Sequence, residues 1–291
     1  MKNDKWLNKN AESLSGKRVA ISGATGGIGR ELCFILAELG AALVLVNRSL
    51  TRAKALEADL INQYPTLEIS HVFADLENME SVKAAADELI NLEIDYLILN
   101  AGAYSIPRKI CESGYDNVFQ INFISPYYLS RRLLPNIEKR GGRVVAVSSI
   151  AHNYSKIDKD DIDFSKRTHA SLVYGNAKRH LTYSLLSQFS DSGSIGISHP
   201  GITFTNITAH YPKLIFAIIK YPMKIIFMKP RIAARSIIRA IYDSTGKYEW
   251  IGPSLFNVWG NPKKKELRTA SAKEIEEISS IAEKIYQEIS K

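Results

Sequence analysis

The chain has 291 residues, of which 45% are hydrophobic and 23% are charged. This composition is that of a soluble globular protein with a large core, and it excludes an intrinsically disordered chain. The net charge of +8 does not predict a nucleic-acid partner, because the sequence has no continuous basic stripe with interleaved aromatic residues.

The segment 1–16 is polar and lacks the apolar region that a signal peptide needs. No apolar run approaches the length of a membrane-spanning helix. Cys33 and Cys111 are the only cysteines, and their spacing is not that of metal ligands, so we expect no metal site and a reducing compartment. Together these features predict a cytoplasmic protein.

Short apolar runs alternate with helical patterns as far as residue 199. The runs are nearly continuously apolar, which is typical of parallel strands buried on both faces. The predicted strands are 18–22, 42–46, 69–73, 96–100, 143–148 and 194–199. The predicted helices between them are 28–39, 50–63, 81–91, 112–134 and 170–188. This alternation predicts a doubly wound (Rossmann) α/β sheet, and we expect 1–291 to form one domain.

The alternation ends after residue 199. Segment 203–230 is strongly apolar, carries lysines at 213, 220, 224 and 229, and is interrupted by prolines. We expect it to be a substrate lid, and two alternatives stay open: an amphipathic segment resting on a membrane surface, or ordinary core helices. A helix is predicted at 231–242, a short strand at 248–252 and an amphipathic helix at 271–290.

A glycine-rich turn, 22–29, joins the first predicted strand to the first predicted helix. Glycines at such a turn let the backbone approach a pyrophosphate and leave free amides at the helix N-terminus. The spacing has two readings, Gly23-Gly27-Gly29 and Gly23-Gly26-Gly29, which belong to different branches of enzymes. The turn predicts a dinucleotide site without deciding between them.

The second predicted strand ends at Val46-Asn47-Arg48. NAD-selective sites usually have an acid here that binds the ribose 2′-hydroxyl, and this strand end has none. Arg48 can instead neutralise a 2′-phosphate. We therefore favour NADP(H) over NAD(H) as the cofactor.

Tyr174 and Lys178 lie four residues apart in a predicted helix, so their side chains share one face. A nearby cation favours the phenolate, and lowering a tyrosine pKa from about 10 to about 7 requires roughly 4 kcal/mol. One lysine supplies part of this, and a positively charged nicotinamide ring would supply more. The paired serines Ser148 and Ser149 precede this helix.

These motifs, in this order, resemble those of the short-chain dehydrogenase/reductase family over residues 17–205. The resemblance implies that Tyr174 transfers the proton during hydride transfer, and that Lys178 lowers the tyrosine pKa and binds the nicotinamide ribose. It implies that Ser149 binds the substrate oxygen and that Asn122 holds a proton-relay water. The implied catalytic residues are Asn122, Ser149, Tyr174 and Lys178.

The resemblance extends to the rest of the cofactor site. Asp75-Leu76 is similar to the family's adenine-contacting pair, Asn100-Ala101-Gly102 to its stabilising turn, and Pro200-Gly201 to its nicotinamide-side loop. The implied cofactor-binding residues are Gly23, Thr25, Gly27, Ile28, Gly29, Asn47, Arg48, Asp75, Leu76, Asn100, Ala101, Gly102, Tyr174, Lys178, Pro200, Gly201, Thr203 and Thr205.

Ser149 and Tyr174 are separated by 25 positions, and the spacer begins with Ala151-His152 after Ile150. This long spacer resembles the retinol-dehydrogenase-like branch, whose substrates are apolar alcohols and carbonyls such as steroids, retinoids or lipid aldehydes and ketones. We interpret His152 as a loop residue and not as a catalytic base. The family also implies a homodimer or homotetramer, paired through two long helices, here 112–134 and 170–188.

Two other functions are compatible with the sequence. A non-catalytic dinucleotide-binding sensor or scaffold could keep the fold, although degenerate members usually lose the tyrosine or the lysine. A sugar-nucleotide epimerase or dehydratase fits the Gly23-Gly26-Gly29 reading, but it needs a larger substrate domain than the residues after His199 provide. We therefore expect an NAD(P)-dependent oxidoreductase.

Overall fold

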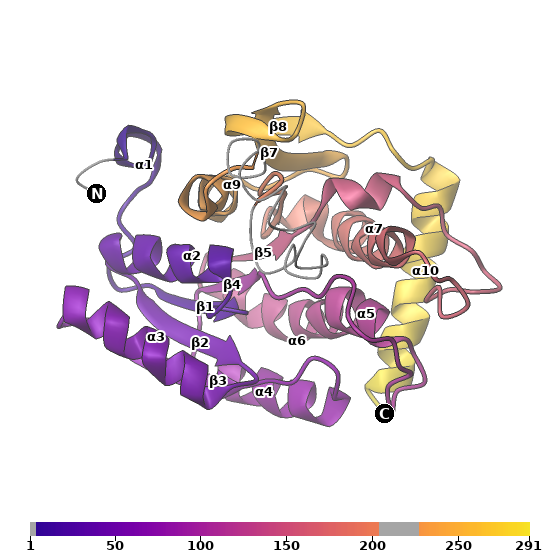
Figure 1. The fold of residues 1–291 in the computed structure, drawn as a ribbon, viewed down its shortest axis with the longest axis horizontal. Helices are drawn as coiled ribbons and strands as arrows, with labels where there is room; N and C mark the ends of the chain where they lie inside the picture. Colours follow the sequence, from indigo (N-terminus) through magenta and orange to yellow (C-terminus); the bar gives the residue numbers. More distant parts are fainter. Residues whose placement is uncertain (1–3, 204–226) are drawn as a thin grey trace, which may run out of the picture.

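The computed structural model describes residues 4–203 and 227–291. A single sheet runs through the molecule with helices packed on both faces (Figure 1). Its strand order is β3-β2-β1-β4-β5-β6-β7-β8. Strands β1 to β7 are parallel, and β8 pairs antiparallel with β7. The predicted doubly wound α/β sheet is confirmed.

The element bounds follow the predicted alternation closely. The strands are β1 (Arg18–Ser22), β2 (Ala42–Asn47), β3 (Ile69–Phe73), β4 (Tyr96–Leu99), β5 (Arg143–Val147), β6 (Ile195–Ser198), β7 (Glu249–Leu255) and β8 (Trp259–Glu266). The described helices are α1 (Lys5–Asn10), α2 (Gly27–Glu38), α3 (Leu50–Gln63), α4 (Met79–Asn91), α5 (Asn117–Phe119), α6 (Ser125–Lys139), α7 (Ala170–Phe189), α9 (Pro230–Tyr242) and α10 (Ala272–Ile289).

Strand β1 shows why the sequences of these strands are continuously apolar. Val19 and Ile21 lie in the core cluster that α2 and α9 cover on one face of the sheet. Ala20 lies in the opposite cluster, which α4, α6 and α7 cover. Both faces of the sheet are therefore covered by helices at β1, and every β1 residue after Arg18 is buried.

The predicted helix 112–134 begins later and ends later than expected. Asp116 caps it: its carboxylate accepts hydrogen bonds from the backbone N–H groups of Val118 (2.9 Å) and Phe119 (3.2 Å). Residue Gly114 has a φ of +84° and forms a turn before this cap. The helix then passes through a π-helical turn, Gln120–Ile124, and continues to Lys139.

The sequence pattern predicts neither α1 nor β8. Strand β8 contains Pro262 and three lysines, and Pro262 is its only buried residue, so it lacks the apolar pattern of a strand. Helix α1 has only six residues. It depends on a distant partner, because the Arg235 guanidinium pairs with the capping Asp4 carboxylate at 2.8 Å.

Helix α10 packs along α7 and contacts the π-helical turn that precedes α6 (Figure 1). Ile278 of α10 packs with Tyr183 of α7. The ring centroid of Tyr286 lies 6.3 Å from that of Tyr127 and 5.7 Å from that of Tyr128, both on α6. A helix of the same chain thus occupies part of the surface of the two long helices expected to pair between subunits.

The predicted lid segment, 203–230, lies largely outside the described residues, and so does Thr205. Its described ends meet, since Thr203 and Met228 form a parallel β-bridge. Among the helices that the structure describes, none is both long and apolar enough to cross a membrane.

Candidate active site

A cavity of about 600 Å³ opens at the carboxyl ends of β1, β2, β3 and β4. This is where the strand order reverses, the usual ligand position in a doubly wound sheet. The cavity brings together many of the residues predicted to bind the cofactor: Gly23, Thr25, Gly27, Ile28, Gly29, Asn47, Arg48, Asp75, Leu76, Asn100, Ala101 and Gly102.

The glycine-rich turn forms one wall of the cavity. Gly23 has a φ of +65°, and a Cβ atom there would lie 2.9 Å from the Ala101 Cα atom. A Cβ atom on Gly29 would lie 2.2 Å from the carbonyl oxygen of Gly23, so both positions require glycine. No side chain caps the N-terminus of α2. Its first amides can therefore bind a pyrophosphate.

Asn100 fixes the shape of this wall. Its Nδ2 atom donates hydrogen bonds to the carbonyl oxygens of Ser22 (3.1 Å) and Gly23 (3.2 Å). The backbone N–H of Ala101 donates to the Ser22 Oγ atom at 3.0 Å. The turn after β4 is thereby tied to the end of β1, which fits the stabilising role that the sequence implies.

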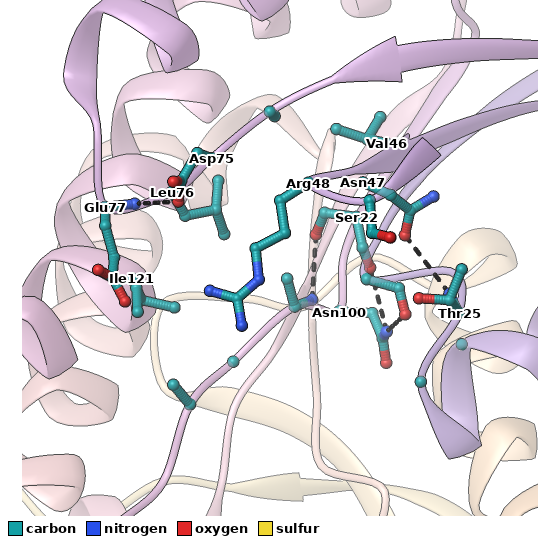
Figure 2. Close-up of a pocket in the computed structure, with 18 of the residues that line it drawn as sticks. Ser22, Thr25, Val46, Asn47, Arg48, Asp75, Leu76, Glu77, Asn100 and Ile121 are labelled. Atoms are coloured by element: carbon teal, nitrogen blue, oxygen red, sulfur yellow. Dashed lines mark hydrogen bonds between the residues drawn. The ribbon is translucent and has the colours of Figure 1, made fainter. Parts of the chain in front are cut away.

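Arg48 is exposed at the end of β2, and its side chain extends into the cavity (Figure 2). Ser49 and Arg52 also line the cavity, and Ser49 caps α3. No acid occupies 46–49. Two guanidinium groups and a hydroxyl therefore surround the place where the adenine ribose lies in this fold. Ser49 and Arg52 were not predicted from the sequence, although Arg52 follows Arg48 by about one helical turn.

The acidic residues of the cavity lie after β3. Asp75 Oδ1 accepts a hydrogen bond from the backbone N–H of Glu77 at 3.1 Å, which holds the carboxylate against the loop that begins α4 (Figure 2). Leu76 is buried beside it. This arrangement offers a polar contact and an apolar surface to a purine ring.

Tyr174, Lys178 and Ser149 come together at the end of β5. The Lys178 Nζ atom lies 5.7 Å from the centroid of the Tyr174 ring and donates a hydrogen bond to the Val147 carbonyl oxygen at 2.9 Å. Ser149 follows β5, and its hydroxyl is hydrogen-bonded to the Tyr174 side chain. The ring of Tyr104 packs edge-on against that of Tyr174, with centroids 5.5 Å apart.

The pKa values of Tyr174 and Lys178 shift in opposite directions from their ordinary values. Burial raises the pKa of Tyr174 to about 12, and the hydrogen bond with Ser149 offsets this only in part. Burial lowers the pKa of Lys178 to about 8. The direction for Tyr174 is opposite to the depression that the resemblance implies. The phenol therefore stays protonated at neutral pH, and its ionisation requires further positive charge nearby.

Asn122 lies in the π-helical turn next to this cluster and is fully buried. Its Oδ1 atom accepts from the Ala103 N–H at 3.2 Å, and its Nδ2 atom donates to the Ala103 carbonyl oxygen at 2.8 Å. A Cβ atom on Gly102 would lie 2.8 Å from Asn122 Oδ1 and 3.6 Å from Lys178 Nζ. Asn122 therefore holds the 102–103 backbone close to Lys178.

The nicotinamide-side loop predicted from the sequence follows β6. Pro200 is buried, and Gly201 has a φ of +83°. A Cβ atom on Gly201 would lie 2.8 Å from the Val258 carbonyl oxygen and 2.9 Å from the Met228 Sδ atom. The loop is thus enclosed between the β7–β8 hairpin and the start of α9.

A buried ion pair that was not predicted from the sequence lies next to Lys178 in the chain. Arg179 is 1% exposed, and its Nε and Nη2 atoms each lie 2.7 Å from a carboxylate oxygen of Glu274 on α10. Its Nη1 atom donates to the His152 carbonyl oxygen at 2.9 Å, and Nη2 donates to the Thr269 carbonyl oxygen at 2.6 Å. One side chain thereby ties α7 to α10 and to the turn that follows Ser149.

His152 lies in that turn, Ile150–Asn153, and its Nδ1 atom lies 2.6 Å from the Ser149 carbonyl oxygen. The His152 ring packs edge-on against Trp250, and the His199 ring stacks on the same indole, each with centroids 5.1 Å apart. Burial lowers the pKa values of His152, His180 and His199 to about 4 each. All three imidazoles are neutral at pH 7.

These histidines should make the free energy of unfolding pH-dependent. Their folded pKa values lie near 4, below the unfolded value of about 6.5, so the unfolded chain binds more protons between these limits. The stability they contribute is complete above pH 6.5 and is lost as the pH falls towards 4. Urea unfolding at stepped pH measures the loss. A constant free energy between pH 6.5 and pH 5, above the carboxylate range, would contradict it.

Comparison with known proteins agrees with this geometry. The family profile for short chain dehydrogenases matches residues 17–159. Short-chain dehydrogenase TIC 32 A, chloroplastic, from Brassica napus is 30% identical over 251 residues, which cover 78% of this chain and 78% of that protein. Retinol dehydrogenase 13 from Homo sapiens is 27% identical over 206 residues, which cover 68% of this chain and 62% of that protein.

The chain spans 52% to 65% of the length of several other curated relatives. Among solved structures, an uncharacterized protein from Mycobacterium Paratuberculosis superposes with a TM-score of 0.75 at 23% identity, with 96% of each chain covered. The Pseudomonas aeruginosa RhlG/NADP active-site complex superposes with a TM-score of 0.59 at 23% identity, with 82% of this chain and 93% of that chain covered. These two likenesses show the fold.

The family profile, the Brassica relative and the retinol dehydrogenases of human and mouse lead to one conclusion. The chain belongs to the short-chain dehydrogenase/reductase family, in its retinol-dehydrogenase-like branch.

Proposed function

We propose that the chain is an oxidoreductase that transfers a hydride between NADP(H) and an apolar alcohol or carbonyl compound. The observation that carries the proposal is the meeting of Tyr174, Ser149 and Lys178 at the carboxyl end of β5. Lys178 lies close to Gly102, which lines the cavity with the uncapped helix N-terminus. A nicotinamide cofactor supplies or accepts the hydride. Every proton transfer falls to residues of this chain.

Each of the four residues has its own role in this reaction. Tyr174, protonated at neutral pH, gives its proton to the carbonyl oxygen during reduction and removes it during oxidation. The Ser149 hydroxyl donates a hydrogen bond to the same oxygen as negative charge develops there. Lys178, whose Nζ atom is held by the Val147 carbonyl, presents a cation to the ribose and to the phenol. Asn122 keeps the 102–103 backbone in place and connects the site to a relay water.

The NADP(H) preference rests on the end of β2. Arg48 and Arg52 line the cavity, and no acid occupies 46–49. The NADP bound to the Pseudomonas relative is consistent with this preference. Pro200, Gly201, Thr203 and Thr205 are proposed for the nicotinamide side, and Asp75 and Leu76 for the adenine.

Arg48→Asp should weaken NADPH binding by more than about 1.5 kcal/mol, because a charge-assisted phosphate contact becomes repulsive. NADH binding should change far less. Titration of the purified protein with each cofactor measures both affinities. Lys54→Asp, an exposed position on α3 that does not line the cavity, controls for the change in net charge. An equal loss for NADPH and NADH would remove Arg48 from the 2′-phosphate site.

A turnover screen tests the proposed function. Steroids, retinoids and fatty aldehydes, each offered with NADPH and with NADH, should give activity with at least one lipophilic carbonyl compound. Activity confined to small polar carbonyls would contradict both the substrate class and the proposed lid at 203–230. Cofactor binding without turnover on any substrate would favour the alternative, a non-catalytic dinucleotide sensor or scaffold.

Partners and compartment are also proposals. A homodimer or homotetramer would have to use a surface other than the α6 and α7 faces that α10 covers. The two thiols, Cys33 and Cys111, are free and buried, and burial raises the pKa of each. Two cysteines that form no disulfide are consistent with a reducing compartment such as the cytoplasm.

A further inference from the structure

The β7–β8 hairpin ends in an apolar turn that its own backbone disfavours. The Val258 N–H donates a hydrogen bond to the Leu255 carbonyl oxygen at 2.9 Å, which encloses Phe256 and Asn257 in a two-residue turn. Both enclosed residues have positive φ, +51° and +58°, as a type I′ turn requires. Asn, Asp and Gly are favoured at these positions, whereas a bulky side chain at positive φ is strained.

Phe256 gains no burial in return for this strain. Its side chain is 85% exposed and that of Leu255 is 57% exposed. Trp259, which is 40% exposed, lies opposite Leu255 across the hairpin. We call Leu255, Phe256 and Trp259 the apolar tip. Because strain without burial has no structural benefit, the position of Phe256 indicates a contact with something other than the described residues 4–203 and 227–291.

The tip is rigidly mounted on the active-site side of the sheet. Lys265 Nζ donates to the Pro253 carbonyl oxygen at 2.6 Å and to Asn257 Oδ1 at 2.8 Å. The Asn257 carbonyl oxygen accepts from the His199 Nε2 atom at 2.9 Å, immediately before the Pro200-Gly201 loop. Since β7 is parallel to β6, the tip lies at the carboxyl edge of the sheet, as the catalytic residues do.

The surroundings of the tip are cationic. Residues 253–262 carry no charge, and three lysines follow them at 263–265. Lys263 on β8 and Lys229 beside Met228 are exposed, and within the described part of the chain neither forms an ion pair. An apolar, aromatic tip with nearby lysines that pair with no described carboxylate has the composition of segments that bind the interface of an anionic membrane.

A second copy of this chain fits the same surface less well. Among the described strands, β8 lies at the edge of the sheet. Its Pro262 lacks an N–H donor, and the three lysines of β8 would repel those of a second β8. The two aromatic side chains of the tip, Phe256 and Trp259, can bury at most roughly 300–500 Å², against about 800 Å² per partner in a stable protein interface.

We propose that the apolar tip inserts into an anionic lipid surface, with Lys263 and Lys229 against the headgroups. This docks the carboxyl edge of the sheet, with the catalytic residues, towards the bilayer. Binding to lipid needs neither cofactor nor turnover and so goes beyond the proposed oxidoreductase function. The entry of lipophilic substrates from the bilayer is a consequence that rests on that function.

Co-sedimentation of the full chain with vesicles tests the proposal. Vesicles of phosphatidylcholine mixed with phosphatidylserine should bind the protein, and added salt or phosphatidylcholine alone should weaken binding. Phe256→Asn should weaken binding at least about tenfold, the low end for losing one buried phenylalanine. The same change should raise the unfolding temperature, because Asn suits a type I′ turn. If Phe256 had only a structural role, Phe256→Asn would lower the unfolding temperature instead.

Phe73→Ser is the matched control. Phe73 is 59% exposed at the end of β3, on the opposite edge of the sheet, and its loss should leave binding unchanged. Lys263→Glu should weaken binding to phosphatidylserine vesicles and leave the weak binding to phosphatidylcholine unchanged. The proposal is overturned if wild-type protein binds neither kind of vesicle, or if Phe256→Asn binds as wild type does. Concentration-dependent self-association abolished by Phe256→Asn, without vesicle binding, would show a second copy as the partner.

Discussion

Tyr174→Phe should lower turnover of a verified carbonyl substrate by at least about a hundredfold, within the range that general acid catalysis supplies. The change removes the one hydroxyl that is hydrogen-bonded to Ser149 and lies beside Lys178, and it keeps the ring that packs against Tyr104. The affinity for NADPH should change little, because the ammonium of Lys178 stays anchored to the Val147 carbonyl oxygen. Steady-state kinetics and cofactor titration measure the two effects separately.

Tyr104→Phe is the matched control for this experiment. The two tyrosines share one edge-on ring contact at 5.5 Å, so both variants lose a hydroxyl from the same cluster. Only the Tyr174 variant should lose the chemical step. Near wild-type turnover by Tyr174→Phe would refute the assignment of Tyr174 as the proton donor. A comparable loss in both variants would point to disrupted packing.

The raised pKa of Tyr174 also predicts how the two reaction directions depend on pH. Burial raises it to about 12, so the phenol is ready to donate a proton across the whole neutral range. Oxidation needs the phenolate, and the protein alone disfavours it. The reductive direction should therefore depend less on pH between 6 and 8 than the oxidative direction, if general acid–base catalysis sets both rates.

Local pattern predicted most of the sheet, because parallel strands buried on both faces leave a plain signal. Strand β1 is an example, with Val19 and Ile21 on one side and Ala20 on the other. The same reasoning could not find β8, whose WGNPKKKE sequence has no apolar alternation and pairs with β7 through its backbone and its lysines. The predicted helix start at 112 was also too early. Asp116, which caps the helix, is one polar residue among several in that loop, so the pattern does not single it out.

The residues that line the cavity could be predicted because they follow the ends of strands in the sequence. Gly23, Arg48, Asp75 and Asn100 each follow or end a strand, and parallel strands bring these ends to one edge. The tertiary partners were not predictable. Arg179 and Glu274 are 95 residues apart, and neither belongs to a local pattern that would identify its partner.

That buried pair should carry a large share of the stability of the site. Replacing Arg179 by methionine removes both contacts to Glu274 and those to the His152 and Thr269 carbonyl oxygens. It leaves the Glu274 side chain, which is only 15% exposed, without its cation. Arg179→Met should lower the free energy of unfolding by about 3 kcal/mol, the low end for breaking a buried ion pair by removing one partner. Urea unfolding at pH 7 measures this loss.

Two further variants separate the ion pair from simple packing. The double variant Arg179→Met with Glu274→Leu should recover most of the loss, because it leaves no unpaired carboxylate between α7 and α10. Lys159→Met should cost less than about 1 kcal/mol, since the Lys159–Glu277 pair at 2.9 Å also joins α10 but the lysine is 65% exposed. A double variant as unstable as Arg179→Met would show that the arginine acts through its bonds to the His152 and Thr269 carbonyl oxygens. In that case its stabilising role belongs to the turn after Ser149, and turnover should fall together with stability.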